Sequence, residues 1–348
     1  MNILEDGLSF FMRALKASRH YGAVDRGKQD VINGAIERVI DNTDTKIRLI
    51  VGYRRKLRHA IESSFEYIDA LVDGIPGALV VNRRSFIEDP QVNSFFVNVE
   101  DLQHKFSRSP EVREFIEADR DRELKDIFSL LCMEKREKTI YGVELNGEIM
   151  RRDVPQIGVS FTDHQMLSPA STEAEARRGL KDCMFQGLTT YALGRLRYFQ
   201  TKREAFEDQG RRLRVRLNSL RTKARRSDSE IESVRIEIRE LERRLAENER
   251  SLSEIKSELD TTDDALEQVN EVIGHPDQVI KYERVHMKIN KLGVKLKEDS
   301  HEPANEIDLA EITFGDSPSR VVVLTKYPRS DILPKEDFLK KASLYLTR

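Results

Sequence analysis

The chain has 348 residues, of which 34% are charged and 7% aromatic, and it contains no tryptophan. Its 59 basic and 61 acidic residues give a formal net charge of −2, which excludes a globally basic nucleic-acid clamp and a polyacidic tail protein. With only 10 prolines and 17 glycines, the sequence is neither collagen-like nor of low complexity. A high charge content beside a modest apolar fraction is typical of long, solvent-exposed helices.

Residues 1–137 are predicted to form a helical N-terminal region. Apolar residues between Ile32 and Leu71 recur at helical spacing, and Ile75-Pro76-Gly77 ends that run. Asp89-Pro90 and Ser109-Pro110 each place an N-cap residue before a proline at the first helical position. We therefore expect helices to begin at these two points and to cover residues 90–106 and 110–136.

The segment 138–172 is predicted to supply two strands. Apolar residues alternate over Thr139–Leu145 and again over Ile157–Phe161. Asn146-Gly147, which lies between the two stretches, is the strongest two-residue signal for a β-hairpin turn.

The segment 292–348 is predicted to supply further strands and a C-terminal helix after Pro334. Ile307–Phe314 alternates with one shift of phase, which predicts a β-bulge, and Val321–Leu324 is apolar on both faces. The simplest arrangement joins these strands with those of 138–172 in one small antiparallel sheet.

Residues 173–291, which separate the two halves of this sheet, are predicted to form a coiled-coil hairpin insertion. From Ile231 onward a single heptad frame runs for six repeats without a stutter, interrupted only at Asn248 and Thr262. The predicted seam of this second arm consists of Ile231, Val234, Ile238, Leu241, Leu245, Leu252, Ile255, Leu259, Leu266 and Val269.

The first arm has a less regular repeat, because Arg203 and Gly210 fall among its apolar positions. Its seven-residue spacing runs through Phe185, Ala192, Phe199, Phe206, Leu213 and Leu220. Only a few residues separate the arms at Arg226–Ser229, so we expect an antiparallel hairpin with arms of about 54 and 45 residues. A connecting helix is expected over Pro276–Lys291. The predicted fold class is thus α+β and mostly helical, with the small sheet split by the long hairpin.

No catalytic or cofactor motif stands out in the sequence. The P-loop, GxGxxG, GxSxG and HExxH patterns are absent, and the seven histidines are scattered. The two cysteines, Cys132 and Cys183, are too few for a four-ligand zinc site or a disulfide framework and favour a reducing compartment.

The most enzyme-like group is Asp163-His164, which follows a strand and precedes Glu173 and Glu175. A carboxylate–histidine group could bind a metal or transfer protons. The simpler interpretation is that Ser168 or Ser171 caps the next helix and that the two glutamates favour its first turn. We therefore expect no catalytic residue, no cofactor, no metal and no small-molecule substrate.

The first of two basic runs lies between Asp44 and Glu62, where six Lys and Arg occur without an acid. With Ile47, Ile50 and Leu57 on one face, the run predicts a basic amphipathic helix over residues 46–58. Such a helix could contact phosphates or an anionic membrane, or it could pack in the core with a solvated basic face. The candidate contacts in this run are Arg54, Arg55, Lys56 and Arg58.

The second run, Arg211–Arg226, has eight Lys and Arg without an acid and ends at the expected hairpin tip. Its candidate contacts to an anionic partner are Arg221, Lys223, Arg225 and Arg226. Residues 228–249 carry eight acids against four arginines, however, and face this run in the hairpin. Internal charge pairing across the coiled coil is therefore the favoured interpretation.

Three hypotheses for function follow. The first is a non-enzymatic, cytoplasmic scaffold whose hairpin mediates self-association, as a homo-oligomer, or binding to a protein partner. The second is a factor that contacts the nucleic-acid backbone through residues 46–58 and 211–226 without reading sequence, since stacking aromatics are scarce there. The third is a peripheral protein that uses residues 46–58 on a membrane surface, where Tyr53 is the single interfacial aromatic.

Overall fold

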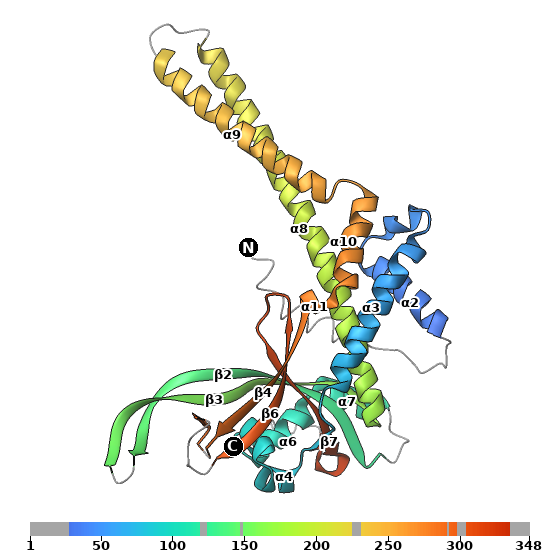
Figure 1. Cartoon of the computed structure of the whole chain (residues 1–348), viewed down its shortest axis with the longest axis vertical. Coiled ribbons are helices and arrows are strands. Elements are labelled where there is room, and N and C mark those ends of the chain that lie inside the picture. Colours follow the sequence, from blue (N-terminus) through green and yellow to red (C-terminus); the bar gives the residue numbers. More distant parts are fainter. Residues whose placement is uncertain are drawn as a thin grey trace, which may run out of the picture. The chain divides into compact units, whose positions relative to one another are not determined.

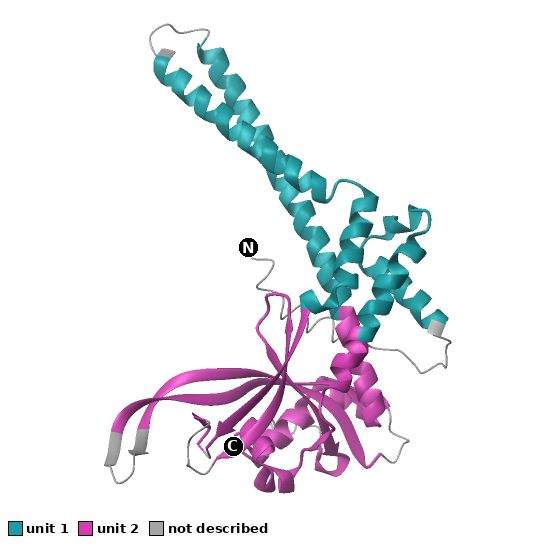
Figure 2. Cartoon of the chain, viewed as in Figure 1, with its two compact units in different colours: residues 1–6, 22–66, 187–279 teal, residues 7–21, 67–186, 280–348 magenta. Residues whose placement is uncertain are grey.

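The computed structural model describes residues 28–118, 124–146, 149–224, 231–290, 292–297 and 304–334, and it combines long helices with one seven-stranded mixed sheet (Figure 1). The chain divides into two compact units, each of which draws on segments far apart in sequence (Figure 2). Unit 1 takes residues 1–6, 22–66 and 187–279, and unit 2 takes the remainder. The expectation of a fold with both helices and a sheet is confirmed.

All the regular elements among the described residues of unit 1 are helices. Its elements are α2 (Lys28–Asn42), the 3-10 helix η1 (Thr45–Leu49), the first part of α3 (Tyr53–Asp73), most of α8 (Glu173–Ala224), α9 (Ile231–Glu258), α10 (Thr262–Gly274) and α11 (Pro276–Val279). Fully buried aliphatic residues come from α2, α3 and α10, among them Ile36, Ile61 and Val269. Apolar residues at helical spacing therefore mark the buried faces, as the sequence predicts.

The second arm is not one continuous helix, because α9 ends at Glu258 and α10 begins at Thr262. Thr261 caps α10: its hydroxyl accepts from the amide of Asp264, and the Asp264 carboxylate accepts from the amides of Thr261 and Asp260. This capping box satisfies helix-end donors that a continuous helix would not expose. The heptad frame continues across the break, and for that reason the apolar pattern alone did not reveal it.

Unit 2 contains the sheet, whose strand order is β1-β7-β2-β3-β5-β4-β6. The strands are β1 (Leu79–Val80), β2 (Asp126–Asn146), β3 (Ile149–Ala170), β4 (Ile280–Ile289), β5 (Val294–Leu296), β6 (Asn305–Phe314) and β7 (Arg320–Pro328). β7 also pairs with β6, so the pairing closes into a circuit. Strands from both sides of the long helices share the sheet as predicted, but β1 runs parallel to β7, so the sheet is mixed.

Four short helices precede β2 and pack against the sheet. They are α4 (Arg83–Glu88), α5 (Pro90–Phe95), α6 (Val99–Arg108) and α7 (Pro110–Ala118). Phe106 stacks on Tyr327 of β7 with ring centroids 4.3 Å apart, and Phe95 meets Phe161 of β3 edge to face at 5.0 Å. These aromatic pairs lie in one buried cluster that joins helices and strands, so they fix the helices onto the sheet.

β2 and β3 form a long, bent antiparallel ribbon (Figure 1). Three register shifts interrupt the pairing, and each places one extra residue on β3. Asp153, Asp163 and Ser168 lie at these points with φ of 57°, 52° and 46°. One class of β-bulge has a residue in this left-handed region, and bulges bend and twist a strand pair. The curvature of the ribbon therefore follows from the three bulges.

Several predicted helices and strands differ from those in the structure. The connecting helix over 276–291 is mostly strand β4, because Val285, Met287 and Ile289 alternate and every residue of β4 pairs with β6. The helix expected over 110–136 ends at Ala118, and Asp126 begins β2.

No bulge interrupts the pairing of β6 with β4, which is continuous over ten residue pairs. The phase shift in β6 has another cause, since Ala310 and Glu311 are both buried where β6 also pairs with β7. The helix predicted over 90–106 is divided into α5 and α6, which Asp89 and Asn98 cap separately. The C-terminal helix expected after Pro334 lies outside the described residues.

The capping box at the start of α10 gives a direct test of the helix break. Thr261→Ala removes the side-chain acceptor for the Asp264 amide and should lower the free energy of unfolding by about 1 kcal/mol, measured by urea denaturation. The neighbouring Thr262→Ala is the control, because Thr262 is the first helical residue and supplies no cap. Equal effects of the two substitutions would contradict the assigned break.

Candidate interaction surfaces

Charged residues link α8 and α9 along the stretch where the two helices lie side by side (Figure 1). Arg214 pairs with Glu249 at 2.8 Å, Arg221 with Glu242 at 2.7 Å, and Arg216 with Glu237 at 2.5 Å. All six side chains are at least 41% exposed, so each pair contributes at most about 1 kcal/mol. Their main effect is on the relative alignment of the two helices. They join the basic run 211–226 to the acidic residues of 228–249, as the charge pattern of the sequence predicts.

The predicted seam is buried unevenly along the second arm. Leu259 and the α10 residues Leu266 and Val269 are buried. Among the α9 seam residues whose side chains the structure describes, Leu241 is the one apolar residue that is buried. The partly exposed ones are Val234, Ile238, Leu245, Leu252 and Ile255, and the side chain of Ile231 lies outside the described residues. A strip of apolar surface thus remains on the α9 part of the arm.

Two of the irregular positions in the heptad frames, Asn248 and Gly210, lie against each other. Asn248 is only 5% exposed, and its side-chain amide donates to the Oε1 of Gln209 at 3.2 Å. The neighbouring Gly210 leaves room for it, since a Cβ at that position would lie 2.9 Å from the Asn248 Oδ1. A buried polar residue that is satisfied in only one alignment specifies the register of two helices.

The candidate residues at the predicted hairpin tip have different environments. Arg221 is paired with Glu242, as described above, and Lys223 is exposed near the end of α8. Arg225 and Arg226 lie outside the described residues. Of the two candidates whose side chains the structure places here, one therefore has an acidic partner within the same unit.

The N-terminal basic residues do not form the single amphipathic helix that the sequence predicts. Residues 46–58 comprise most of η1, a turn at 50–52 and the start of α3, because the extended Ile50 ends η1 and Gly52 adopts a positive φ of 77° before α3. Arg54 pairs with Glu37 at 2.9 Å, Lys56 with Asp263 at 3.3 Å, and Arg58 donates to Asn33. The remaining candidate, Arg55, is exposed.

The Asp163-His164 group does not form a catalytic arrangement with the glutamates that follow it. Asp163 pairs with Arg320 at 2.7 Å, and Arg320 is only 4% exposed. Glu173 pairs instead with Arg177, while Glu175 accepts from Ser171 and donates its amide to Thr172. The two glutamates thus take the helix-starting roles that the simpler interpretation gave them, although strand β3 continues through Ser168.

His164 is a structural residue of the helix–sheet core. Its Nε2 donates to the backbone carbonyl of Phe95 at 2.6 Å, and its ring stacks on Phe96. Burial lowers the pKa of His164 below its ordinary value, so the imidazole is neutral at pH 7. Burial also raises the pKa of the Cys132 thiol to about 12, which leaves it protonated and unreactive.

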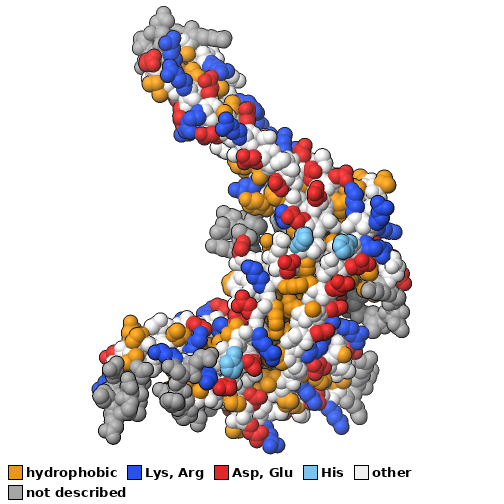
Figure 3. Space-filling model, viewed as in Figure 1, with side chains coloured by type: hydrophobic (Ala, Val, Ile, Leu, Met, Phe, Trp, Pro, Cys, Tyr) orange, Lys and Arg blue, Asp and Glu red, His pale blue; other side chains and the backbone are white. Residues whose placement is uncertain are grey.

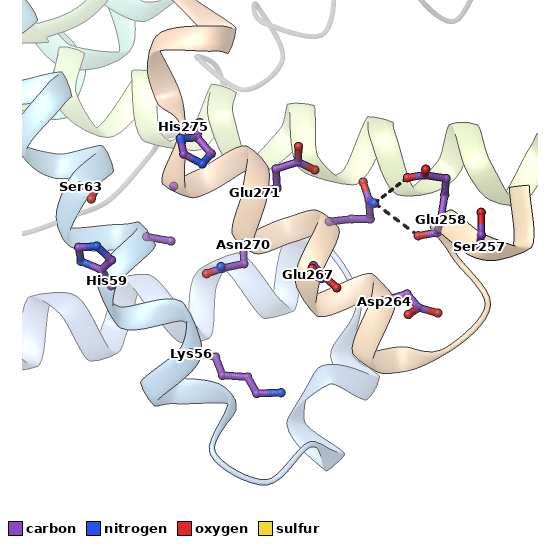
Figure 4. A pocket seen from close by; sticks show the side chains of 13 residues that line it. Lys56, His59, Ser63, Ser257, Glu258, Asp264, Glu267, Asn270, Glu271 and His275 are labelled. Carbon is purple, nitrogen blue, oxygen red and sulfur yellow. Dashed lines mark hydrogen bonds between the residues drawn. The ribbon is translucent and has the colours of Figure 1, made fainter. Parts of the chain in front are cut away.

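A cavity of about 670 Å³ in unit 1 lies between α3, the end of α9 and α10 (Figure 4). His59 and His275 line it together with Glu267 and Glu271. No sequence signal predicted this cavity, because its lining residues come from distant segments without a motif. Glu271 pairs with Arg195, so one of the carboxylates that line the cavity already has a structural partner.

Comparisons with known proteins do not assign this chain to a family: a scan against protein-family models and searches of curated proteins and of solved structures each found no significant match. Among the described residues, no three His, Cys, Asp or Glu side chains are grouped so that they could hold a metal ion. None of the helices in the described ranges is long and apolar enough to cross a membrane.

The contact between Gly210 and Asn248 predicts a coupling that a double-mutant cycle can measure. Gly210→Ala should destabilise the protein by about 1 kcal/mol despite alanine's better helix propensity, because the new methyl group would crowd the Asn248 Oδ1. Adding Asn248→Ala should remove that penalty. Gly194→Ala on the same helix is the control, since a Cβ there meets nothing within 4 Å. A stabilising Gly210→Ala would contradict the assigned register.

The Asp163–Arg320 pair predicts a pH-dependent stability. Although burial raises the pKa of Asp163, the hydrogen bonds from Gln165 and Arg320 outweigh it and leave this pKa below its ordinary value. The contribution of Asp163 is therefore complete above its unfolded pKa of about 3.9 and is lost as the pH falls through the lower folded value.

Asp163→Asn should lower the free energy of unfolding at pH 7, because Arg320 loses its charged partner. The loss should be at most about 3 kcal/mol, since solvent screens the 42% exposed carboxylate. Denaturation of the two proteins at pH 7 and in acid should show the difference shrinking as Asp163 becomes protonated. A difference independent of pH would exclude this ion pair as its cause.

Proposed function

We propose that α8 and α9 form an antiparallel coiled-coil hairpin and that the protein is a non-enzymatic assembly protein that associates with a second copy of itself through this hairpin. The observation that carries the proposal is the strip of partly exposed apolar seam residues along α9. Two helices alone cover such a seam incompletely, and further helices in a bundle would bury it. Both cysteines are buried and neither takes part in a disulfide, which favours a reducing environment and is consistent with a cytoplasmic protein.

The ion pairs support the antiparallel arrangement. With Leu217 of α8 and Leu245 of α9 at equivalent a positions, Arg214 and Arg221 take e positions, as do their partners Glu249 and Glu242. Arg216 and its partner Glu237 both take g positions. Reversing one helix of a coiled coil brings like-named flanks together, so e–e and g–g pairs are expected for antiparallel arms.

The same pairs favour assembly over nucleic-acid binding. Arg214, Arg216 and Arg221 come from the basic run that would contact phosphates, and each has a carboxylate partner on α9. A phosphate contact would have to displace these partners. The carboxylates of α9 therefore compete with nucleic acid for these arginines.

Self-association is tested by light scattering of the full chain over a range of concentrations. We expect a mass of at least twice the 40.3 kDa of one chain at high concentration. Ile238→Asp places a carboxylate in the partly buried seam and should lower the mass of the assembly. Ile236→Asp is the matched control, because Ile236 is 59% exposed and lies outside the seam. A mass of one chain at every concentration would refute the self-association.

The hairpin itself is tested by exchanging the charges of one ion pair. Arg221→Glu should destabilise the protein by about 0.2–1 kcal/mol through repulsion from Glu242, with a smaller effect in high salt. Combining it with Glu242→Arg should restore the stability measured by thermal unfolding. If the double variant is no more stable than the single one, Arg221 and Glu242 are not neighbours in solution.

A further inference from the structure

The turn between η1 and α3 presents two aliphatic side chains almost completely to solvent. Leu49 is 83% exposed and Val51, two residues later, is 95% exposed. Ile47 and Leu57 on either side of them in the sequence are buried, so the core of unit 1 is formed without these two positions. Large aliphatic side chains so exposed and so close together indicate contact with something outside the chain.

The conformation of the turn is fixed by its neighbours. Ile47 is fully buried, and the amide of Ile50 donates to its carbonyl at 3.1 Å. The left-handed Gly52 then reverses the chain, and its carbonyl accepts from the amides of Arg55 and Lys56. The aliphatic side chains at 49 and 51 are therefore held outward by a packed and hydrogen-bonded turn.

The charges around this turn are arranged asymmetrically. The Glu37 carboxylate accepts from Arg48, Tyr53 and Arg54, so this acid is engaged by three donors. Asp41 pairs with Arg48, and Asp44 caps η1 by accepting from the Lys46 amide. The side chains of Lys46 and Arg55 are exposed, and no acidic partner lies against them among the described residues. Figure 3 shows apolar and basic side chains together at this end of unit 1.

We propose that this turn docks the protein on an anionic membrane surface. Leu49 and Val51 enter the boundary between headgroups and acyl chains, while Lys46 and Arg55 meet the lipid phosphates. The combination of apolar side chains with flanking cations is what interfacial membrane contacts use. Nucleic acid would engage the cations but would leave the two aliphatic side chains in water. The proposal is independent of the self-association through α9.

The geometry fits a fluid surface better than a rigid protein partner. The side chains of Leu49 and Val51 are 83% and 95% exposed. They become fully buried only in a medium that surrounds them. A lipid interface does this without a preformed pocket. The contact is thus made by a turn and not by the basic amphipathic helix that the sequence predicts for residues 46–58.

The test is co-sedimentation of the full chain with vesicles of phosphatidylcholine alone and of phosphatidylcholine with phosphatidylserine. We expect binding to the anionic vesicles that weakens as salt rises. The double variant Leu49→Ser/Val51→Ser should bind at least about tenfold more weakly, because it loses the apolar insertion. Lys46→Gln/Arg55→Gln should lose the preference for phosphatidylserine. Unchanged circular dichroism and melting temperatures establish that these surface variants remain folded.

The matched control is Ile87→Ser/Val97→Ser, which removes two aliphatic side chains that are 81% and 87% exposed in unit 2. This variant should bind the vesicles as the unaltered protein does. The proposal is overturned if the unaltered protein does not bind anionic vesicles, or if the turn variant binds as well as the control variant. Equal losses in both double variants would likewise overturn it, since the contact would then not be specific to the turn.

Discussion

The separation of the sheet strands by the long helices α8 to α10 is the constraint on which the rest of the structure depends. The sheet receives β2 and β3 before α8 begins, and it receives β4 to β7 only after α10 and α11 end. The chain must therefore return to the sheet after this long helical segment, because β7 pairs with β2 over residues 126–133. Charge pairs and one buried asparagine link α9 to α8, and a separate helix, α10, follows the break at Thr261.

Much of this arrangement was predictable from the sequence, and the reasons are physical. Heptad spacing depends on local geometry, and it located helices α8 and α9. The N-cap and proline signals are local too, and they located two helix starts at Asp89-Pro90 and Ser109-Pro110. Helix α10 and strand β4 were misjudged because a continuous apolar frame hides a capped break and because alternation within β4 is short. The three bulges in β3 were missed, since Asp and Ser in a left-handed conformation leave no periodic signal.

The candidate surfaces were predictable only where charge runs marked them. The run 211–226 pointed to α8, and the acidic run opposite it pointed to its internal partners. The turn with Leu49 and Val51 was not found, because its apolar residues look like a helix face until Gly52 reverses the chain. In both regions most acids and bases neutralise each other within unit 1. The features left over are apolar: the exposed strip on α9 and the two side chains of the turn.

The most direct test of the central claim is hydrogen–deuterium exchange of the full chain at low and high protein concentration. Burial of the α9 strip in an assembly predicts slower amide exchange between Val234 and Ile255 as concentration rises, because added packing suppresses local opening of the helix. Exchange in the paired parts of β2 and β7 should not change. Identical exchange along α9 at both concentrations would contradict assembly through this strip.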